Sequence, residues 1–177
     1  MQKVCSFLLL WFLAVTFSGF QKKSSKETVN WLSFEETEQR LKEKPLPVLI
    51  DVYTDWCGWC KVMDKRTYAK PQVASYLNQK FYSIKFNAEG KQPITWKGKT
   101  YRYNPQYKIH ELALELIKGE MAFPNTVIIP VSTTTPQSIP GFLEPKDMQV
   151  VATYFGENKF GQVDFETYSR SFRPTWK

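Results

Sequence analysis

The sequence predicts a single α/β domain in which helices flank a central mixed sheet. The segment 47–54 is a nearly continuous run of β-branched and aromatic residues, as expected of a buried parallel strand. Helical segments separate it from a second strand over 81–87, and this order indicates a right-handed crossover and parallel pairing. Two further strands, over 126–131 and 137–142, are joined by the turn 133–136 and can therefore pair antiparallel.

Local signals place the helices around these strands. Ser33 and Glu36 have the spacing of a capping box, which predicts a helix over 34–44 that the prolines after it bring to an end. Further helices are expected at 58–69, 71–79, 109–118, 145–155 and 165–172.

The chain between the second and third strands breaks this alternation. The segments 94–96 and 101–103 flank the turn 97–99 and predict a small β-hairpin with an aromatic face. In the helix that follows, the apolar residues fall on one stripe, and Gly119 can end it in the left-handed conformation. His110, the single histidine, is expected to face solvent.

Length and charge narrow the function classes. At 177 residues the chain suits one domain plus an export segment. The net charge is +7, but the 24 Lys and Arg residues occur in short scattered groups with no long run of like charge. We therefore interpret the basic residues as solvated faces and expect no nucleic-acid partner.

Residues 1–20 have the pattern of a secretory signal peptide, with Lys3 ahead of an apolar stretch and small residues near its end. The apolar stretch is at the short limit for spanning a bilayer, so an uncleaved N-terminal membrane anchor is the alternative. We expect an exported protein, periplasmic or otherwise extracytoplasmic. In the mature chain, residues 21–30 are expected to form a linker, 31–157 the folded domain, and 158–177 a tail packed on that domain.

Cysteine usage favours redox chemistry over a structural framework. Of the three cysteines, Cys5 lies in the export segment, so Cys57 and Cys60 remain in the mature protein. Zinc needs three or four protein ligands and the chain has one histidine, so we expect no metal site. A structural disulfide closing so short a loop would remove little chain entropy. Outside the cytosol, two cysteines at this spacing usually exchange disulfides. We therefore expect a redox-active Cys57–Cys60 disulfide and no bound cofactor.

The pair Cys57-Gly58-Trp59-Cys60 lies where a predicted buried strand gives way to a helix. The first cysteine is then at the helix N-terminus, where unpaired backbone N–H groups favour the thiolate and lower the thiol pKa. The second lies one turn into the helix and can close a disulfide. Cys57 is therefore predicted to be the nucleophile, and Cys60 the thiol that resolves the mixed disulfide.

Asp51 interrupts the apolar strand that leads to this pair. Burial disfavours the charged carboxylate, so the pKa of Asp51 should rise and allow proton exchange near neutral pH. We expect Asp51 to take the proton of Cys60, through water, as that thiol resolves the mixed disulfide. The alternative is a purely local role as a cap or as an ion pair with Lys85.

These residues resemble the thioredoxin family. The run 47–61, PVLIDVYTDWCGWCK, is similar to the family's strand and active-site segment, including the aspartate ahead of the cysteine motif. Residues 84–87 resemble the next strand, in which Lys85 would approach the buried carboxylate, and residues 123–126 resemble the cis-proline loop. The resemblance implies a cis peptide bond before Pro124. It also implies that the substrate is bordered by Trp56, Gly58, Trp59, Phe123 and Pro124.

Within this thioredoxin-like superfamily, the chain is most similar to exported bacterial thioredoxin-like proteins and to the C-terminal domain of the membrane thiol:disulfide interchange reductase. Two features depart from the family pattern: Gly58-Trp59 replaces Gly-Pro, and a hairpin plus helix over about 91–119 is inserted before the cis-proline loop. The insert either shapes a partner surface or forms satellite core, and we favour the second.

Three functions fit these observations. The leading hypothesis is a monomeric disulfide reductase or interchange protein that acts on protein disulfides and dithiols and is kept reduced by a membrane electron donor. The second is a dithiol oxidase or isomerase, because the dipeptide between the cysteines helps to set the redox potential and hence the direction. The third is a non-catalytic module that binds a partner through the insert.

Overall fold

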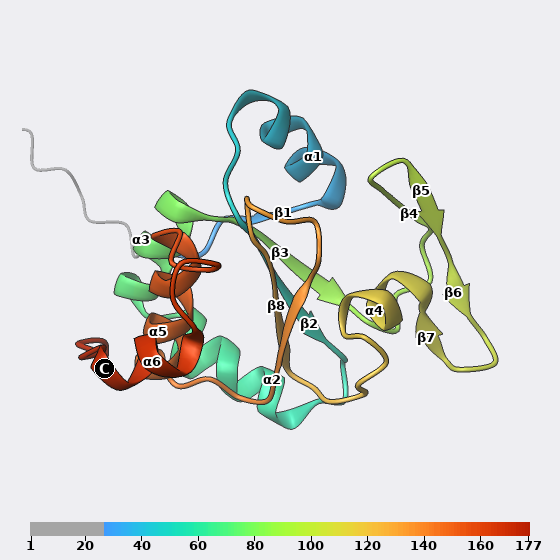
Figure 1. Ribbon diagram of the computed structural model, residues 1–177. Helices are drawn as coiled ribbons and strands as arrows, with labels where there is room; N and C mark the ends of the chain where they lie inside the picture. The colour runs from blue at the N-terminus through green and yellow to red at the C-terminus, as the bar shows by residue number, and fades with distance from the viewer. Residues whose placement is uncertain (1–26) are drawn as a thin grey trace, which may run out of the picture.

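The computed structural model describes residues 27–177 (Figure 1). The expected signal peptide, residues 1–20, lies outside the described residues. The expected linker, residues 21–30, is described only at its last residues, where Val29 is buried. The Asn78 side chain accepts a hydrogen bond from the backbone N–H of Asn30 and donates one to the Thr28 carbonyl oxygen. In the described part of the chain, no helix has both the length and the apolar character needed to cross a bilayer.

The central sheet contains five strands in the order β1-β3-β2-β8-β9. Strand β2 pairs parallel with β3 and antiparallel with β8, which in turn pairs antiparallel with β9, so the predicted mixed sheet is confirmed. The bounds of the five strands are β1 (Trp31–Leu32), β2 (Val48–Tyr53), β3 (Tyr82–Asn87), β8 (Asn125–Ile129) and β9 (Gln137–Pro140).

Helices cover both faces of this sheet, as predicted. Their bounds are α1 (Phe34–Glu43), α2 (Gly58–Met63), the π-helical turn η1 (Asp64–Tyr68), α3 (Pro71–Lys80), α4 (Glu111–Leu116), α5 (Pro145–Gly156) and α6 (Phe165–Ser171). The capping box predicted for α1 is present, with the Ser33 side chain accepting from the backbone of Glu36 and the Glu36 carboxylate accepting from the backbone of Ser33. The expected helix over 58–69 is divided, because α2 widens into η1 at Asp64.

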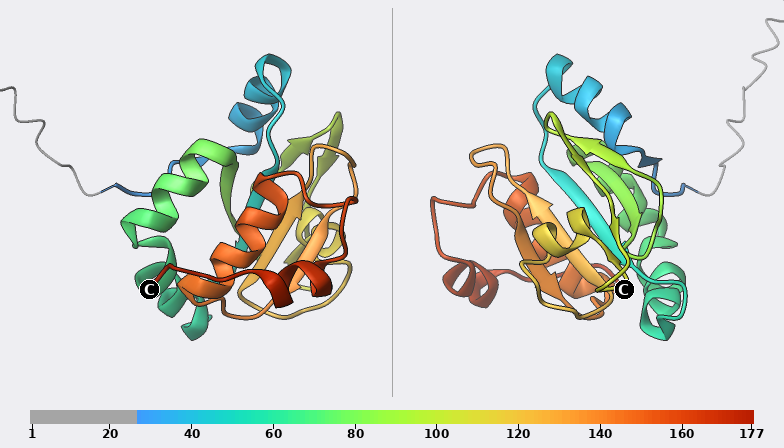
Figure 2. Two further views of the ribbon diagram at one scale, coloured as in Figure 1. Left: turned by 60° about the vertical axis from the view of Figure 1, so that its left-hand side comes forward. Right: turned by 90° about the vertical axis from the view of Figure 1, so that its right-hand side faces the viewer.

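The two faces of the sheet carry separate apolar clusters. On one face, Phe34 of α1 and Leu112 of α4 pack with Ile50 and Phe86 of the sheet. On the other face, α2, α3 and α5 cover the sheet through side chains that include Met63, Leu77 and Met148. Figure 1 shows α3 and α5 on one side of the strands and α4 on the other, and Figure 2 turns each face toward the viewer.

The insert consists of two small antiparallel ribbons followed by α4. Its strands are β4 (Ile94–Trp96), β5 (Lys99–Tyr101), β6 (Tyr103–Asn104) and β7 (Ile109–His110). The hairpin was predicted, but its turn is tighter than expected, because Lys97 and Gly98 both adopt positive φ and form a two-residue connection. Strand β5 therefore begins at Lys99 rather than at Tyr101. Helix α4 ends at Leu116, two residues before the predicted end at Lys118. Gly119 adopts the predicted left-handed conformation at φ 77°, and Lys118 before it already has φ 53°.

The prediction that His110 faces solvent is wrong, because the residue is fully buried. It belongs to β7 rather than to the helix, and the extended backbone turns its side chain into the domain, edge-on to Phe86 at 5.4 Å. Its Nδ1 accepts a hydrogen bond from the backbone N–H of Leu112 at 3.2 Å and so caps α4, while Nε2 lies 3.1 Å from the Gln92 carbonyl oxygen. The ring thus fastens the insert to the domain.

The C-terminal segment returns across α5 and α3. The Tyr168 hydroxyl donates to Thr153 Oγ1 of α5 at 2.9 Å. Further on, the Gln149 carboxamide oxygen accepts from the backbone N–H of Trp176 at 2.9 Å, and the Trp176 ring packs edge-on against Tyr76 with centroids 5.5 Å apart. The segment therefore covers the outer side of the two helices.

Candidate active site

The two cysteines lie at the junction that the sequence predicts, between the end of β2 and the start of α2. Cys57 is the N-cap of α2, and its Sγ accepts a hydrogen bond from the backbone N–H of Cys60 at 3.0 Å. The two residues form a disulfide, with 4% of Cys57 and 3% of Cys60 exposed. The structure therefore holds the oxidised form of the pair, with the first sulfur at the helix N-terminus, where a thiolate is favoured.

Two exposed tryptophans flank the disulfide in sequence. Trp56 is 67% exposed and Trp59 is 61% exposed, which is unusual for side chains of this size. Trp56 donates from Nε1 to Glu89 Oε1 at 2.9 Å, whereas Trp59 packs on Phe142 with centroids 5.5 Å apart. Each indole is thus held by a contact on one side while much of its surface remains open.

The Phe123–Pro124 peptide bond is cis, as the thioredoxin resemblance implies. Phe123 packs edge-on against Trp56 with centroids 6.1 Å apart, which brings the loop beside the cysteine motif. Strand β8 follows directly, with Asn125 paired to Val52 at the end of β2 that leads to the motif. The aromatic border of the site therefore comes from both segments. Gly58 has open space around it, so no close neighbour requires a glycine there.

Asp51 is buried in β2, between Lys85 of β3 and Thr126 of β8 in the strand register. Burial raises the pKa of Asp51 to about 6, although the Lys85 ammonium opposes this rise. Lys85 Nζ donates to Asp51 Oδ2 at 2.7 Å, so the ion pair that the sequence suggested is present. A carboxyl group with this proton affinity can take up and release a proton near neutral pH.

Lys85 also donates to Asp64 Oδ1, a partner that the sequence interpretation missed. Burial lowers the pKa of Lys85, but the two carboxylates outweigh it and the net shift is upward. The ammonium lies over the rings of Tyr53, Trp31 and Tyr68, at 4.9, 5.3 and 5.7 Å from their centroids. A helical turn separates Asp64 from Cys60, and this spacing was the available signal that Asp64 faces the same side as the resolving cysteine.

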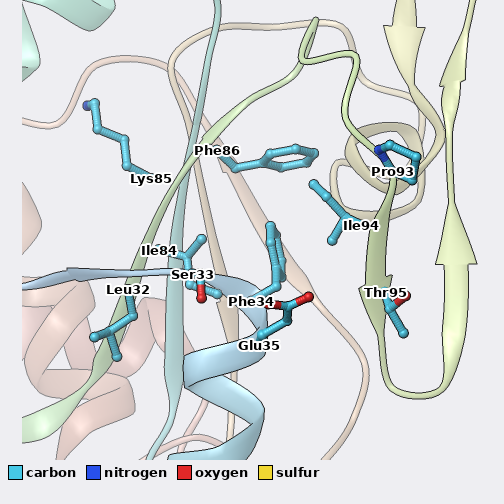
Figure 3. Close-up of a pocket in the computed structure, with 10 residues that line it drawn as sticks. All are labelled: Leu32, Ser33, Phe34, Glu35, Ile84, Lys85, Phe86, Pro93, Ile94 and Thr95. Atoms are coloured by element: carbon cyan, nitrogen blue, oxygen red, sulfur yellow. The ribbon is translucent and has the colours of Figure 1, made fainter.

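A separate hollow of about 240 Å³ lies between the first turn of α1, β3 and β4 (Figure 3). Its lining is mainly apolar and includes Phe34, Phe86 and Ile94, while the Lys85 side chain points away from it. Lys85 therefore belongs to the Asp51 group rather than to this hollow. Among residues 27–177, no cluster of three or more His, Cys, Asp or Glu side chains is placed to hold a metal ion.

The fold is shared with solved thioredoxin-like structures. A thioredoxin-fold protein from Helicobacter pylori matches 83% of this chain and 84% of its own at 14% identity, with a TM-score of 0.55. A thioredoxin from Thermus thermophilus matches 76% of this chain and 95% of its own at 14% identity, with a TM-score of 0.51. These matches place the chain in the class of thioredoxin-fold proteins, and it carries a disulfide at the N-terminus of α2.

Within this class, residues 12–100, half of the chain, match the DsbH-type thioredoxin family described as "Protein of unknown function, DUF255". The chain belongs to this family. The match spans the cysteine motif, Asp51 and Lys85, and it ends within the insert.

Curated relatives match shorter segments. The thiol:disulfide interchange protein DsbD of Vibrio vulnificus (strain CMCP6) is 44% identical over 48 residues, which is 25% of this chain and 8% of that protein. DsbD of Escherichia coli (strain K12) is 46% identical over 44 residues, 24% of this chain and 8% of that protein. The uncharacterized protein B0495.5 of Caenorhabditis elegans is 26% identical over 78 residues, 44% and 11% of the two chains. The chain thus spans about a tenth of the length of these relatives.

Proposed function

We propose that the protein is an exported thiol–disulfide oxidoreductase that reduces or interchanges disulfides of protein substrates through Cys57 and Cys60. The observation that carries this proposal is the Cys57–Cys60 disulfide at the start of α2, on the strand–helix unit that also buries Asp51. A disulfide with this position and a nearby carboxyl of near-neutral pKa has the parts that exchange chemistry requires.

The reaction begins from the reduced pair. The Cys57 thiolate attacks a substrate disulfide, one substrate sulfur leaves as a thiolate, and a mixed disulfide forms. The Cys60 thiol then gives its proton to the Asp51 carboxylate, and the resulting thiolate attacks the Cys57 sulfur. The Cys57–Cys60 disulfide forms, the second substrate sulfur leaves, and both substrate thiolates take up protons. The substrate gains two electrons, which the cysteine pair loses.

The exposed aromatic border suits a protein substrate. Trp56, Trp59 and Phe123 offer apolar surface around a disulfide that is itself almost covered. An extended peptide lying across this surface would bury the two indoles and bring its own disulfide to Cys57. The cis-proline loop would offer its backbone to the same peptide, and we assign Gly58 and Pro124 to this border as well.

Reduction as the direction, and export as the setting, rest on relationship and on sequence. The related interchange proteins named DsbD, together with the signal-peptide pattern of residues 1–20, support an extracytoplasmic protein that receives electrons from a membrane donor. We propose that it acts as a monomer. A measured redox potential of the pair decides the direction, since a strongly reducing value fits a reductase and a strongly oxidising value fits a dithiol oxidase.

Reduction of insulin disulfides by dithiothreitol tests the activity. The protein should accelerate the reaction, whereas Cys57→Ser should abolish the acceleration, since the attacking sulfur is removed. A matched control, Ser132→Ala on the loop between β8 and β9, should behave as the unchanged protein. No acceleration by protein with both thiols free would contradict the proposal. Full biological activity of a double Cys57→Ser, Cys60→Ser variant would instead favour a binding module.

A further inference from the structure

Three buried oxygen atoms around Asp51 have no hydrogen-bond partner among the described residues. They are Asp51 Oδ1, the Tyr68 hydroxyl and Thr126 Oγ1. Buried polar groups are nearly always paired, so several unpaired ones in one place are a feature that needs a physical reason.

The three groups converge from three elements on one face of the sheet. Asp51 and Thr126 are partners in the register of β2 and β8. Directly paired residues project to the same side, so both point toward the layer that holds α2 and η1. Tyr68, at the end of η1, is buried in that layer, and Lys85 Nζ, which bonds to Asp51, lies 5.7 Å from the centroid of its ring.

The Tyr68 hydroxyl keeps its proton in this environment. Burial raises the pKa of Tyr68 well above its ordinary value and the Asp51 carboxylate raises it further, while the neighbouring Thr126 hydroxyl opposes part of this rise. Tyr68 is therefore a hydrogen-bond donor at every pH at which the cysteines work. The Thr126 hydroxyl is a donor as well. The other titratable groups that face Asp51 are Tyr53 on its own strand, Lys85 on β3 and Asp64 on η1.

We propose that Tyr68 and Thr126 are positioning residues for Asp51, donating hydrogen bonds to its free oxygen, directly or through one water molecule, when the carboxylate ionises. Lys85 holds one oxygen of the carboxylate and the two hydroxyls stabilise the other. Together they set the pH at which Asp51 can accept the proton of Cys60. This role in catalysis rests on the proposed function, whereas the control of Asp51 ionisation does not depend on it.

The variant Tyr68→Phe tests the proposal, because it removes the hydroxyl and keeps the ring that packs edge-on against Trp31. The carboxyl signal of Asp51, followed by NMR in the oxidised protein, should titrate about one pH unit higher, since a donor to the charged form is lost. The matched control is Tyr154→Phe, a buried tyrosine whose hydroxyl bonds to the Val163 carbonyl, and it should leave the Asp51 titration in place.

A second pair of variants keeps the test decisive if Tyr68→Phe does not fold. Thr126→Val should raise the Asp51 titration, whereas Thr126→Ser, which keeps the hydroxyl, should not. An Asp51 titration unchanged in both Tyr68→Phe and Thr126→Val, or moved equally by Tyr154→Phe, would overturn the proposal. In the insulin assay the acid limb of the pH–rate profile should shift with the titration. A moved titration without any insulin reduction would uphold the positioning role and contradict the proposed enzyme.

Discussion

Asp51 behind the disulfide and His110 under the insert are both buried titratable side chains, but they are held in different ways. Both ring nitrogens of His110 face backbone groups, those of Leu112 and Gln92. Asp51 has one oxygen paired to the Lys85 ammonium, and its other oxygen is unpaired among the described residues. The histidine is thus held neutral near neutral pH, whereas the carboxyl group can gain or lose a proton there.

This contrast shows that burial alone does not mark a functional group. Burial lowers the pKa of His110, and its Nδ1 must stay unprotonated to accept from Leu112. Burial raises the pKa of Asp51 toward neutrality, where gain and loss of a proton are both accessible. A buried group whose polar atoms are fully paired stabilises structure, and one with a free atom and a near-neutral pKa can serve chemistry.

The largest expected effect is on turnover. Replacing Asp51 by Asn removes the proton acceptor, and the rate of insulin reduction at pH 7 should fall by about 10- to 100-fold. Stability at this pH should not fall, because a buried charge is removed. The control is His110→Asn, whose rate per folded molecule should stay within about twofold of the original. Equal losses of insulin-reduction rate in the two variants would contradict a catalytic role specific to Asp51.

His110→Leu should affect stability instead. The change leaves the Leu112 N–H and the Gln92 carbonyl without their partner, and unfolding in urea should show a loss of about 2–4 kcal/mol. Hydrogen exchange should locate the loosening in α4 and the neighbouring strands of the insert. Loss of exchange protection around α2, with the insert unchanged, would contradict a structural role for His110.

The two groups should also give opposite pH dependences of stability. The folded pKa of Asp51 is raised, so its contribution is full below about pH 3.8 and is lost as the pH rises through about 6, amounting to about 1–3 kcal/mol. The folded pKa of His110 is lowered, so its contribution is full above about pH 6.5 and declines as the pH falls below that value. The free energy of unfolding, measured in urea at a series of pH values, tests this. Asp51→Asn should remove the loss of stability as the pH rises toward about 6, and His110→Asn should remove the loss of stability as the pH falls below about 6.5, each without changing the other dependence.

The smallest effect is expected at Asp64. Its carboxylate shares Lys85 with Asp51, and its charge is a minor contribution to the raised pKa of Asp51. Asp64→Asn should therefore lower the Asp51 titration by about half a pH unit, since Lys85 becomes free to pair with Asp51 alone. NMR of the oxidised protein measures this shift. A rise in the Asp51 titration would show that Asp64 supports the ion pair rather than competing for it.

Local sequence signals were sufficient for most of the fold. The capping box at Ser33, the apolar run of β2 and the hairpin around Gly98 each act through neighbouring residues, and each is present in the structure. The exceptions depend on tertiary contacts. Strand β1 is only two residues long, and His110 is buried because β7 pairs with β6.

The candidate site likewise combines residues that local sequence signals predicted with residues that only tertiary contacts bring together. Cys57, Cys60 and Asp51 were readable because a short motif and an acidic residue in an apolar strand are visible in sequence. The grouping of Tyr68 and Thr126 around Asp51 was not, since it depends on strand register and on the π-helical turn that divides the active-site helix. The four-residue separation from Cys60 was the remaining signal for Asp64, and it is useful only where a helix is already known.

Trapping a mixed disulfide tests most directly that Cys57 is the attacking thiol of an exchange site. A Cys60→Ala variant, reduced and then mixed with a peptide disulfide, should retain one half of the peptide on Cys57, as mass spectrometry of proteolytic fragments would show. The matched Cys57→Ala variant should retain little or none, because Cys60 lies one turn into α2. Predominant trapping on Cys60, or none by either variant, would contradict the account.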